Sequence, residues 1–559
     1  MPLIAFLVLG YFAGLLAGFG AVGTFAGTIA AIVMVAAVVG GAPRVAGAGA
    51  MILAGCVTGS SASDARRLCV ARAATSQAVV VSLRDDVAPG GCSRGELGCG
   101  GEASVFVARG RAAAGASAGA TGDISATSDT TAVLIRAATV TVVNAPPWTA
   151  RFRSAAGRAV DRDFKGDAPL VRALVLADMR GMSPEIRDRW AAAGMVHMLS
   201  VSGLHVGIIA VVVELLLGVM RVSRKSAPII AIIIIAAYVL IIGAPAPAVR
   251  SAVMLGVRAM SQLMQRSVSP WAILAIGAAH PFVDPWIVLD LGYQLSVIGV
   301  AALIAAAALV KRLPIPERPR WSRGVVAATT CTIVASIASL PLVAYTMGRV
   351  SLIAPVSNLI AGPVVAAVQP MLFLGVLLAP VPAAAGFVAD AAHPILAAMN
   401  GIATISAMVP GASVAVWPST GSAVLVGIIA IGVLMACVDR HSLRPLVVAG
   451  IASVFLVWMP PPRGAAMTEL HMIDVGQGDA IALRTKAGRW VLFDAGRIWE
   501  GGDAGRRTIV PYIAHRGGRL EAFVLSHPHA DHVGGAASVI DALTPGRYVD
   551  GGFVTSSEA

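Results

Sequence analysis

The stretch Ala227–Gly243, APIIAIIIIAAYVLIIG, decides the fold class of this chain. It carries no charged side chain, and apolar stretches of about 17 to 25 residues recur along most of the sequence, each long enough as a helix to cross a hydrocarbon core of roughly 30 Å. The 559 residues are 57% hydrophobic and only 13% charged, with a mean hydropathy of +0.80, far outside the range of soluble globular proteins. We therefore predict a polytopic all-α membrane bundle of about 12 to 13 apolar segments.

The apolar segments fall into two groups. Three fill residues 3–58 in a first region, 1–60, and the first of them is interpreted as a retained helix because no basic region precedes it. The second group occupies residues 196–460, and its segment near Trp271 is short and could be re-entrant. Its ten segments begin near Val196, Ala227, Val249, Trp271, Trp286, Val325, Leu352, Ala383, Ser422 and Pro445.

Basic loops between these segments predict the orientation of the chain. Because Lys and Arg accumulate in cytoplasmic loops, alternating crossings place the N-terminus in the cytoplasm of an inner (plasma) membrane protein. The net charge of +12 fits such loops better than a nucleic-acid-binding surface. The four loops used are 221–225, 265–267, 311–323 and 439–444. Residues 69–147 and those after Met459 are then extracytoplasmic, although Arg66, Arg67 and Arg72 conflict with this orientation.

A small β-domain is predicted within residues 61–150. Short β-type runs at Ala78–Leu83, Ala103–Ala108, Thr131–Ala137 and Ala138–Val143 indicate a barrel or sandwich. The stretch 109–130 between them is rich in Gly, Ala and Ser, which is typical of a flexible loop. Residues 151–195 that follow predict amphipathic helices at the membrane surface.

The six cysteines divide by their surroundings. Cys92 and Cys99 flank a polar, Gly-rich loop, and their spacing suits a disulfide if this domain faces an oxidising compartment; two unpaired thiols remain the alternative. The other four lie in or just past apolar segments and are interpreted as packing residues: Cys56, Cys69, Cys331 and Cys437.

The run Ser526–Gly535, SHPHADHVGG, is the clearest chemical motif. His527 and His529 can bind one metal ion, while Asp531 and His532 can bind a second, and neighbouring divalent ions can activate water for hydrolysis of a phosphodiester or another ester. Only ten histidines occur in the chain, so a chance cluster on a polar loop is the weaker interpretation. Three aspartates at a turn and a strand end nearby are expected to frame this loop: Asp474, Asp479 and Asp494.

Polar residues inside apolar segments form a second set of candidates. Such residues are costly in lipid and usually face a bundle interior or an aqueous path, although Ser and Gly also serve close helix packing. Arg250 could pair with Asp290 or hold a phosphate. The predicted channel residues are His197, Ser200, Ser202, His205, Arg250, Asp290, Gln294 and Asn358.

The segments DVGQGDA (474–480), LFDAG (492–496) and SHPHADHVGG (526–535) resemble the metallo-β-lactamase fold. The resemblance implies an αββα domain over residues 467–559, two divalent ions such as zinc or manganese, Asp531 as the catalytic residue and Asp494 as support for the metal loop. It also implies further ligands, another His and a bridging Asp. No histidine follows His532, so we expect an incomplete site and a truncated domain.

Three other segments resemble the ComEC family of competence proteins: AAAGMVHMLSVSGLHVGIIA (191–210), LGYQLSVIGVAAL (291–303) and SLPLVAYTMGRVSLIAPVSNLIAGPVV (339–365). The resemblance implies an OB-like β-domain and a membrane channel that takes up single-stranded transforming DNA while a nuclease-type domain degrades the other strand. It implies single-stranded DNA, membrane lipid, a DNA receptor outside, a DNA-translocating ATPase inside and a homo-oligomer as partners. A membrane-anchored phosphoester hydrolase without transport and a solute transporter are the alternatives.

Overall fold

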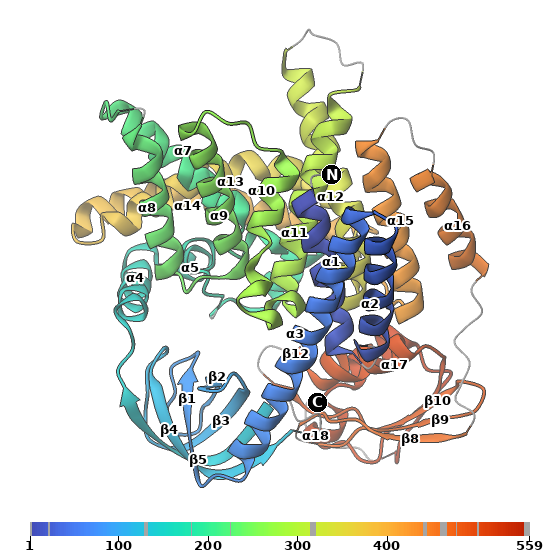
Figure 1. Ribbon diagram of the computed structural model, residues 1–559. Helices are drawn as coiled ribbons and strands as arrows, with labels where there is room; N and C mark the ends of the chain where they lie inside the picture. Colours follow the sequence, from blue (N-terminus) through green and yellow to red (C-terminus); the bar gives the residue numbers. More distant parts are fainter. Residues whose placement is uncertain are drawn as a thin grey trace. The chain divides into compact units, whose positions relative to one another are not determined.

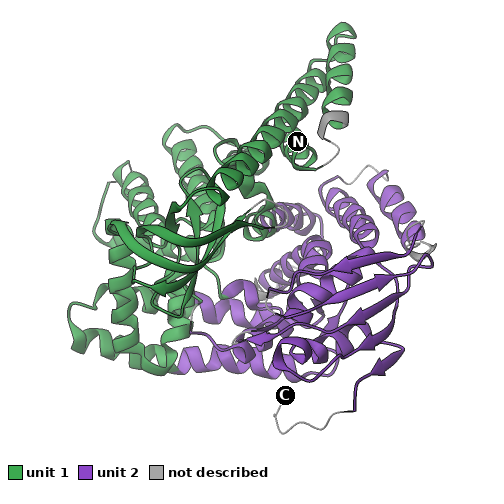
Figure 2. Ribbon diagram, turned by 90° about the horizontal axis from the view of Figure 1, so that it is seen from below, with its two compact units in different colours: residues 1–179, 199–297, 367–393 green, residues 180–198, 298–366, 394–559 purple. Residues whose placement is uncertain are grey.

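A computed structural model describes residues 3–20, 23–127, 132–179, 181–223, 225–313, 320–439, 444–458, 467–476, 478–499 and 502–552. The chain divides into two compact units (Figure 2). Unit 1 contains residues 1–179, 199–297 and 367–393, and unit 2 contains residues 180–198, 298–366 and 394–559.

The first three helices pack through glycines. They are α1 (Leu3–Phe19), α2 (Gly23–Val39) and α3 (Pro43–Ala74). A Cβ added to Gly14 would lie 2.1 Å from the carbonyl oxygen of Ile52, and one added to Gly55 would lie 2.2 Å from that of Tyr11. Small residues therefore let α1 and α3 approach at backbone distance, as is common between membrane helices. The third helix continues to Ala74, well beyond the composition change at Ser60.

A closed five-stranded barrel follows α3, which confirms the predicted small β-barrel (Figure 1). The strands are β1 (Ala78–Leu83), β2 (Cys92–Leu97), β3 (Glu102–Arg109), β4 (Ser117–Ala126) and β5 (Ala132–Asn144), in the order β1-β2-β3-β5-β4. Alternate side chains point inward, and Val81, Val105 and Ile135 are fully buried. The Gly-, Ala- and Ser-rich stretch contains β4, so the prediction of a flexible loop over its whole length is wrong. Small residues fit β4 because Ala118 and Ala120 are buried inside the barrel and a Cβ added to Gly122 would lie 2.5 Å from the carbonyl oxygen of Arg136 on β5.

The predicted disulfide pairing is wrong. Cys69 near the end of α3 is bonded to Cys99 in the turn between β2 and β3, while Cys92 is free and exposed. The error follows from the extra turns of α3, because the sequence places Cys69 just past an apolar segment and the helix in fact carries it to the barrel wall. Cys69 is thus a cross-linking residue rather than a packing residue.

Short helices connect the barrel with the second group of apolar segments. They are α4 (Trp148–Phe164), η1 (Lys165–Asp167), α5 (Ala168–Leu176), α6 (Pro184–Ala192) and η2 (Val196–Met198). The helix α4 is amphipathic, whereas most side chains of α5 are buried in the interior of unit 1. Ser183 caps α6 by accepting a hydrogen bond from the backbone N–H of Ile186.

Helical elements occur at all ten predicted segments of the second group. They are α7 (Gly203–Val219), α8 (Ser226–Ile241), α9 (Ala246–Leu263), α10 (Pro270–Gly277), α11 (Leu291–Val310), α12 (Arg320–Met347), α13 (Ala354–Leu377), α14 (Pro382–Met408), α15 (Thr420–Val438) and α16 (Arg444–Trp458). Two short 3-10 helices, η3 (His280–Phe282) and η4 (Pro285–Leu289), separate α10 from α11. The eight residues of α10 are too few to span a bilayer.

Six helices of the described residues are long and apolar enough to cross a membrane: α3, α11, α12, α13, α14 and α15. Shorter apolar helices add to them, among them α1, α7 and α8. The chain is therefore a multi-pass membrane protein of mainly helical structure. A short ribbon of β6 (Arg349–Ser351) and β7 (Ser413–Ala415) joins the ends of α12 and α14 within unit 2.

The C-terminal region of unit 2 is built on a five-stranded sheet in the order β14-β13-β10-β9-β8. Its strands are β8 (Glu469–Met472), β9 (Ile481–Arg484), β10 (Trp490–Phe493), β13 (Leu520–Val524) and β14 (Arg547–Val549). The remaining elements are β11 (Ile498–Trp499), β12 (Gly502–Asp503), the π-helical segment η5 (Gly505–Ile509), α17 (Val510–Arg516), α18 (Ala530–Val533) and α19 (Ala536–Leu543). Trp490, Phe523 and Ile513 lie in the fully buried core between sheet and helices.

Candidate metal centre

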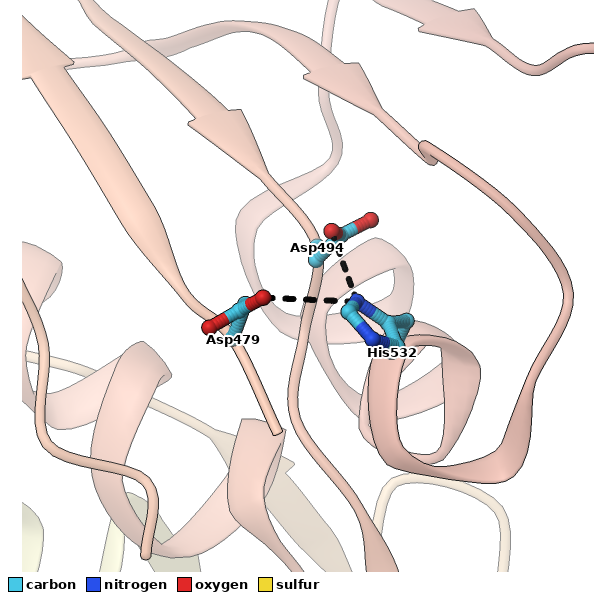
Figure 3. Close-up of side chains that lie close together, drawn as sticks. All are labelled: Asp479, Asp494 and His532. Atoms are coloured by element: carbon cyan, nitrogen blue, oxygen red, sulfur yellow. Dashed lines mark hydrogen bonds and ion pairs between the residues drawn. The ribbon is translucent and has the colours of Figure 1, made fainter. Parts of the chain in front are cut away.

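Asp494 is a buried residue after β10 that contacts both ends of the predicted metal loop 526–532 (Figure 3). It follows β10 with a backbone φ of +58°, a left-handed conformation that Asp adopts more readily than most residues. Its carboxylate accepts hydrogen bonds from the backbone N–H and the hydroxyl of Ser526, at 2.8 and 2.7 Å. It also contacts Nδ1 of His532 at 2.9 Å. One buried carboxylate thus fixes both ends of the loop 526–532.

Three histidine rings of the motif gather beside this carboxylate. The centroid of the His527 ring lies 4.6 Å from that of His529 and 4.0 Å from that of His532. His527 Nδ1 lies 2.9 Å from the hydroxyl of Ser526, and His532 Nδ1 faces Asp494. Because Nδ1 of both rings has a partner, Nε2 of both remains for another ligand. The sequence spacing of the motif therefore becomes a cluster of imidazoles.

Close backbone packing holds the turn before β9 against this loop. Gly478 has a φ of +100°, and a Cβ there would lie 1.8 Å from the carbonyl oxygen of Asp531. Only glycine fits that position. Backbone hydrogen bonds join Gly496 to Asp479 at 3.0 Å and Ala495 to His532 at 2.8 Å. The three segments that carry the predicted aspartates and histidines are therefore in direct contact.

The side chains at this contact suit a divalent metal ion. Possible ligand atoms of Asp479, Asp494 and His532 lie within 4.8 Å of one another. Asp494 already accepts bonds from Ser526 and His532, so its position is that of a group that orients His532 rather than a ligand. Asp531 lies beside His532, with its carboxylate 3.9 Å from Nε2. Imidazole nitrogens with an exposed carboxylate form a donor set typical of zinc and related ions.

The third predicted aspartate is not part of this contact. Asp474 is exposed and accepts a hydrogen bond from the backbone N–H of Gly476 at 3.0 Å, which closes its own turn. Ser526 had no predicted role of its own. Its place at the end of β13, immediately before His527, is the signal that could have indicated one.

The predicted channel residues lie in both units. In unit 1, Nδ1 of the fully buried His205 accepts from the backbone N–H of Ser202 at 3.2 Å and lies 3.0 Å from its hydroxyl, which caps α7. His197 lies in η2 and Ser200 in the turn after it. Asn358 lies on α13 in unit 2, where its side-chain oxygen has no hydrogen-bond partner among the described residues.

Arg250 is the least satisfied buried cation of unit 1. It is 2% exposed, and Nε and Nη2 have no hydrogen-bond partner among the described residues. Its Nη1 donates to the carbonyl oxygen of Tyr293 at 3.4 Å, and the guanidinium lies 5.5 Å from the centre of the tyrosine ring. Asp290 instead accepts from the backbone N–H of Tyr293 at 2.6 Å, and Gln294 donates to the carbonyl oxygen of Val288 at 2.8 Å. Tyr293, which had no predicted role, joins the two charged groups.

Comparison with known proteins gives separate matches for the membrane region and for the C-terminal domain. A family model described as "Competence protein" matches residues 174–441, and one described as "Metallo-beta-lactamase superfamily" matches residues 473–552. "ComE operon protein 3" of Bacillus subtilis is 25% identical over 386 residues, which cover 66% of this chain and 49% of the relative. "Competence protein ComA" of Neisseria gonorrhoeae is 32% identical over 401 residues, which cover 69% and 53%.

A shorter match is stronger in identity: "Recombination protein 2" of Haemophilus influenzae is 39% identical over 85 residues, 14% of this chain and 11% of the relative. The chain spans about half the length of ComE operon protein 3 and ComA. No solved structure shows a significant match to the chain.

Fold and site together define a multi-pass membrane protein that carries a metallo-β-lactamase superfamily domain. Within that class the chain is a homologue of the competence proteins ComE operon protein 3 and ComA, so the predicted resemblance to the ComEC family is confirmed.

Proposed function

We propose that the protein is an inner-membrane channel for uptake of single-stranded transforming DNA, and that its C-terminal domain degrades the other strand outside the cytoplasm. The observation that carries this proposal is the presence on one chain of a Competence protein domain and a metallo-β-lactamase superfamily domain whose histidine loop is assembled. Such an uptake requires two activities, transport of one strand and hydrolysis of phosphodiesters in the other, and the two domains would supply one each.

In the hydrolytic domain, His527, His529, Asp531 and His532 would hold divalent metal ions, zinc or manganese. A metal ion bound there supplies an acidified water molecule and positive charge for a phosphodiester. The residues of the chain act around it: Asp494 holds the tautomer and direction of His532, and Ser526 holds His527. Asp531, exposed beside His532, is placed to accept a proton from water at its carboxylate oxygen.

In the membrane region, Arg250 is the strongest candidate for contact with the DNA backbone. A buried guanidinium with two unpartnered nitrogens is costly unless an anion or water satisfies it, and a phosphate would do so. His205, Ser202, Asp290 and Gln294 are further candidates on the same unit. His197, Ser200 and Asn358 stay as predictions of weaker structural support.

The barrel would bind single-stranded DNA as an OB-like domain. Exposed arginines on its strands or directly after them could track a phosphate backbone, and exposed Phe106 offers one stacking surface. These arginines are Arg84, Arg94, Arg109 and Arg136. The disulfide between Cys69 and Cys99 supports an extracytoplasmic barrel, since disulfides persist in oxidising compartments. A DNA receptor outside, a DNA-translocating ATPase inside and self-association are partners that this role would require.

Uptake of DNA with differently labelled strands tests the proposal. A competent strain that lacks its own homologue is complemented with the wild-type chain, with Arg250→Ala or with His527→Ala. We expect the wild type to restore entry of one strand, Arg250→Ala to abolish entry, and His527→Ala to abolish release of labelled fragments outside.

The outcomes separate the alternatives. Entry of DNA at the wild-type rate in the uncomplemented strain would sink the channel proposal. Release of fragments by the wild type without entry of either strand would favour a membrane-anchored phosphoester hydrolase. Arg489→Ala is the matched control, because Arg489 pairs with Glu521 at 3.8 Å on the surface of the C-terminal domain and lies in neither site.

A further inference from the structure

A charged contact joins the C-terminal domain to helix α6 inside unit 2. The guanidinium of Arg506 forms two contacts with the carboxylate of Asp188, at 3.1 Å from Nη1 and 3.2 Å from Nη2. Arg349 on β6 also approaches Asp188, donating from Nη1 to its backbone carbonyl at 3.3 Å. Nη1 of Arg349 also lies 4.0 Å from the carboxylate of Asp188, so this carboxylate faces two arginines. Burial and the neighbouring Arg506 lower the pKa of Arg349, and Asp188 opposes that shift.

Arg506 belongs to η5, which leans directly on the end of the metal loop. A Cβ added to Gly505 would lie 2.1 Å from the carbonyl oxygen of Gly535, the last residue of the SHPHADHVGG motif. Gly535 in turn donates to the carbonyl oxygen of Gly496 at 3.3 Å, two residues after Asp494. Any displacement of η5 would therefore move the backbone at Gly535, which ends the loop that carries the three histidines.

A second carboxylate fixes the inner side of η5. Asp503 accepts a hydrogen bond from the backbone N–H of Arg506 at 2.8 Å and another from the hydroxyl of Ser538 on α19, also at 2.8 Å. The segment is thus held between Asp503 inside the domain and Asp188 on α6. A π-helical turn is rare and is found frequently at functional sites.

We propose that Arg506 is a positioning residue that couples helix α6 to the metal loop: its bidentate contact with Asp188 keeps η5 pressed against Gly535. Both side chains are about half exposed, 45% for Arg506 and 50% for Asp188, so the pair adds little to overall stability. Its effect is on geometry. Movement of α6, which leads into the segment 191–210, then changes the arrangement of His527, His529 and His532.

Hydrogen exchange on the full chain in lipid nanodiscs, without metal, tests this coupling. We expect Arg506→Gln and Asp188→Asn each to raise amide exchange in residues 530–535 about two- to fivefold, the range that loss of one exposed ion pair permits. Exchange in β10 and β13 should not change. The double variant should exceed neither single variant, because both remove the same contact. Arg489→Gln, whose ion pair lies wholly within the domain, should have no effect.

Metal binding is a second readout, which rests on the proposed metal site and is interpreted separately from hydrogen exchange. Titration with Mn²⁺ alone should give several-fold weaker binding in both single variants. Failure of the wild type to bind Mn²⁺ would contradict the proposed hydrolytic site, while the exchange experiment would still decide the coupling. Unchanged exchange in residues 530–535, an equal rise in β13, or additive effects in the double variant would each overturn the proposal.

Discussion

The two β-sheet domains of this protein are attached to its helices in opposite ways. The barrel continues from α3 without a break and is bonded back to that helix through Cys69 and Cys99. The C-terminal domain instead contacts helices of its own unit through side chains: Arg506 bonds to Asp188 on α6, and the ring of His515 is stacked 3.8 Å from that of Tyr345 on α12. A covalent tie and a continuous helix permit no exchange of partners, whereas side-chain contacts do. The difference indicates a barrel tied firmly to α3 and a C-terminal domain whose contacts with the helices of unit 2 can change.

Loss of the disulfide should have the largest effect, and it tests whether the covalent bond to α3 stabilises the barrel. Cys99→Ser opens a loop with a sequence separation of 30 residues. The free energy of unfolding of the barrel should fall by about 3 to 4 kcal/mol, because the unfolded chain is no longer cross-linked. Hydrogen exchange should show at least a hundredfold loss of protection in β1–β5 and none in β8–β14. Cys92→Ser is the control, and equal protection in both variants would contradict the bond.

Replacement of Asp494 tests whether the stability and metal affinity of the C-terminal domain depend on its buried carboxylate. Asp494→Asn weakens the bonds from Ser526 and His532, and the domain should lose roughly 2 kcal/mol of stability and at least tenfold in divalent metal affinity. Thermal unfolding and Mn²⁺ titration measure the two effects. Asp474→Asn, at an exposed turn, should change neither. Equal effects of the two substitutions would show that the buried carboxylate has no special role.

Removal of the stacked contact between His515 and Tyr345 tests whether side chains hold the C-terminal domain against its helices. His515 Nε2 also lies 2.9 Å from the carbonyl oxygen of Tyr345 and donates to it. His515→Ala should lower the free energy of unfolding by about 1 to 1.5 kcal/mol, because one stacked ring pair and one hydrogen bond are lost. Proteolysis between α16 and β8 should nevertheless become faster, since the domain separates more often from α12. Unchanged cleavage would place the attachment elsewhere.

Thiol labelling of Cys92 gives the smallest and most specific effect. Partial desolvation raises the pKa of this thiol, Asp85 adds to the increase, and Arg94 opposes it. The thiolate is therefore scarcer at pH 8 than in an ordinary cysteine, and labelling by a maleimide should be slower and should accelerate above pH 9. Intact-protein mass spectrometry of the folded barrel measures the rate. Rapid labelling of Cys69, with Cys92 and Cys99 both protected, would instead restore the rejected pairing.

The sequence predicted the parts of the fold that depend on local pattern. Apolar length predicted the helices, and β-branched alternation predicted β1 and β3. It failed at β4, where Ala118 and Ala120 are buried in the barrel and a Cβ added to Gly122 would lie 2.5 Å from the carbonyl oxygen of Arg136. It also failed at Cys69, whose partner depends on where a long helix ends. The motif spacing predicted which histidines gather, but no local signal joins Asp188 to Arg506, which lie 318 residues apart.

The length of α3 has a consequence for how the barrel is presented. Its 32 residues extend about 48 Å, some 18 Å more than a hydrocarbon core requires. Since each residue turns the helix by about 100°, the number of residues between lipid and Cys69 sets both the height of the barrel and the direction its wall faces. One inserted alanine would rotate that wall by more than a quarter turn, while seven would raise it by about 10 Å and nearly restore its direction. The length of α3 thus sets both the height and the direction of the barrel surface that would bind DNA in the proposed function.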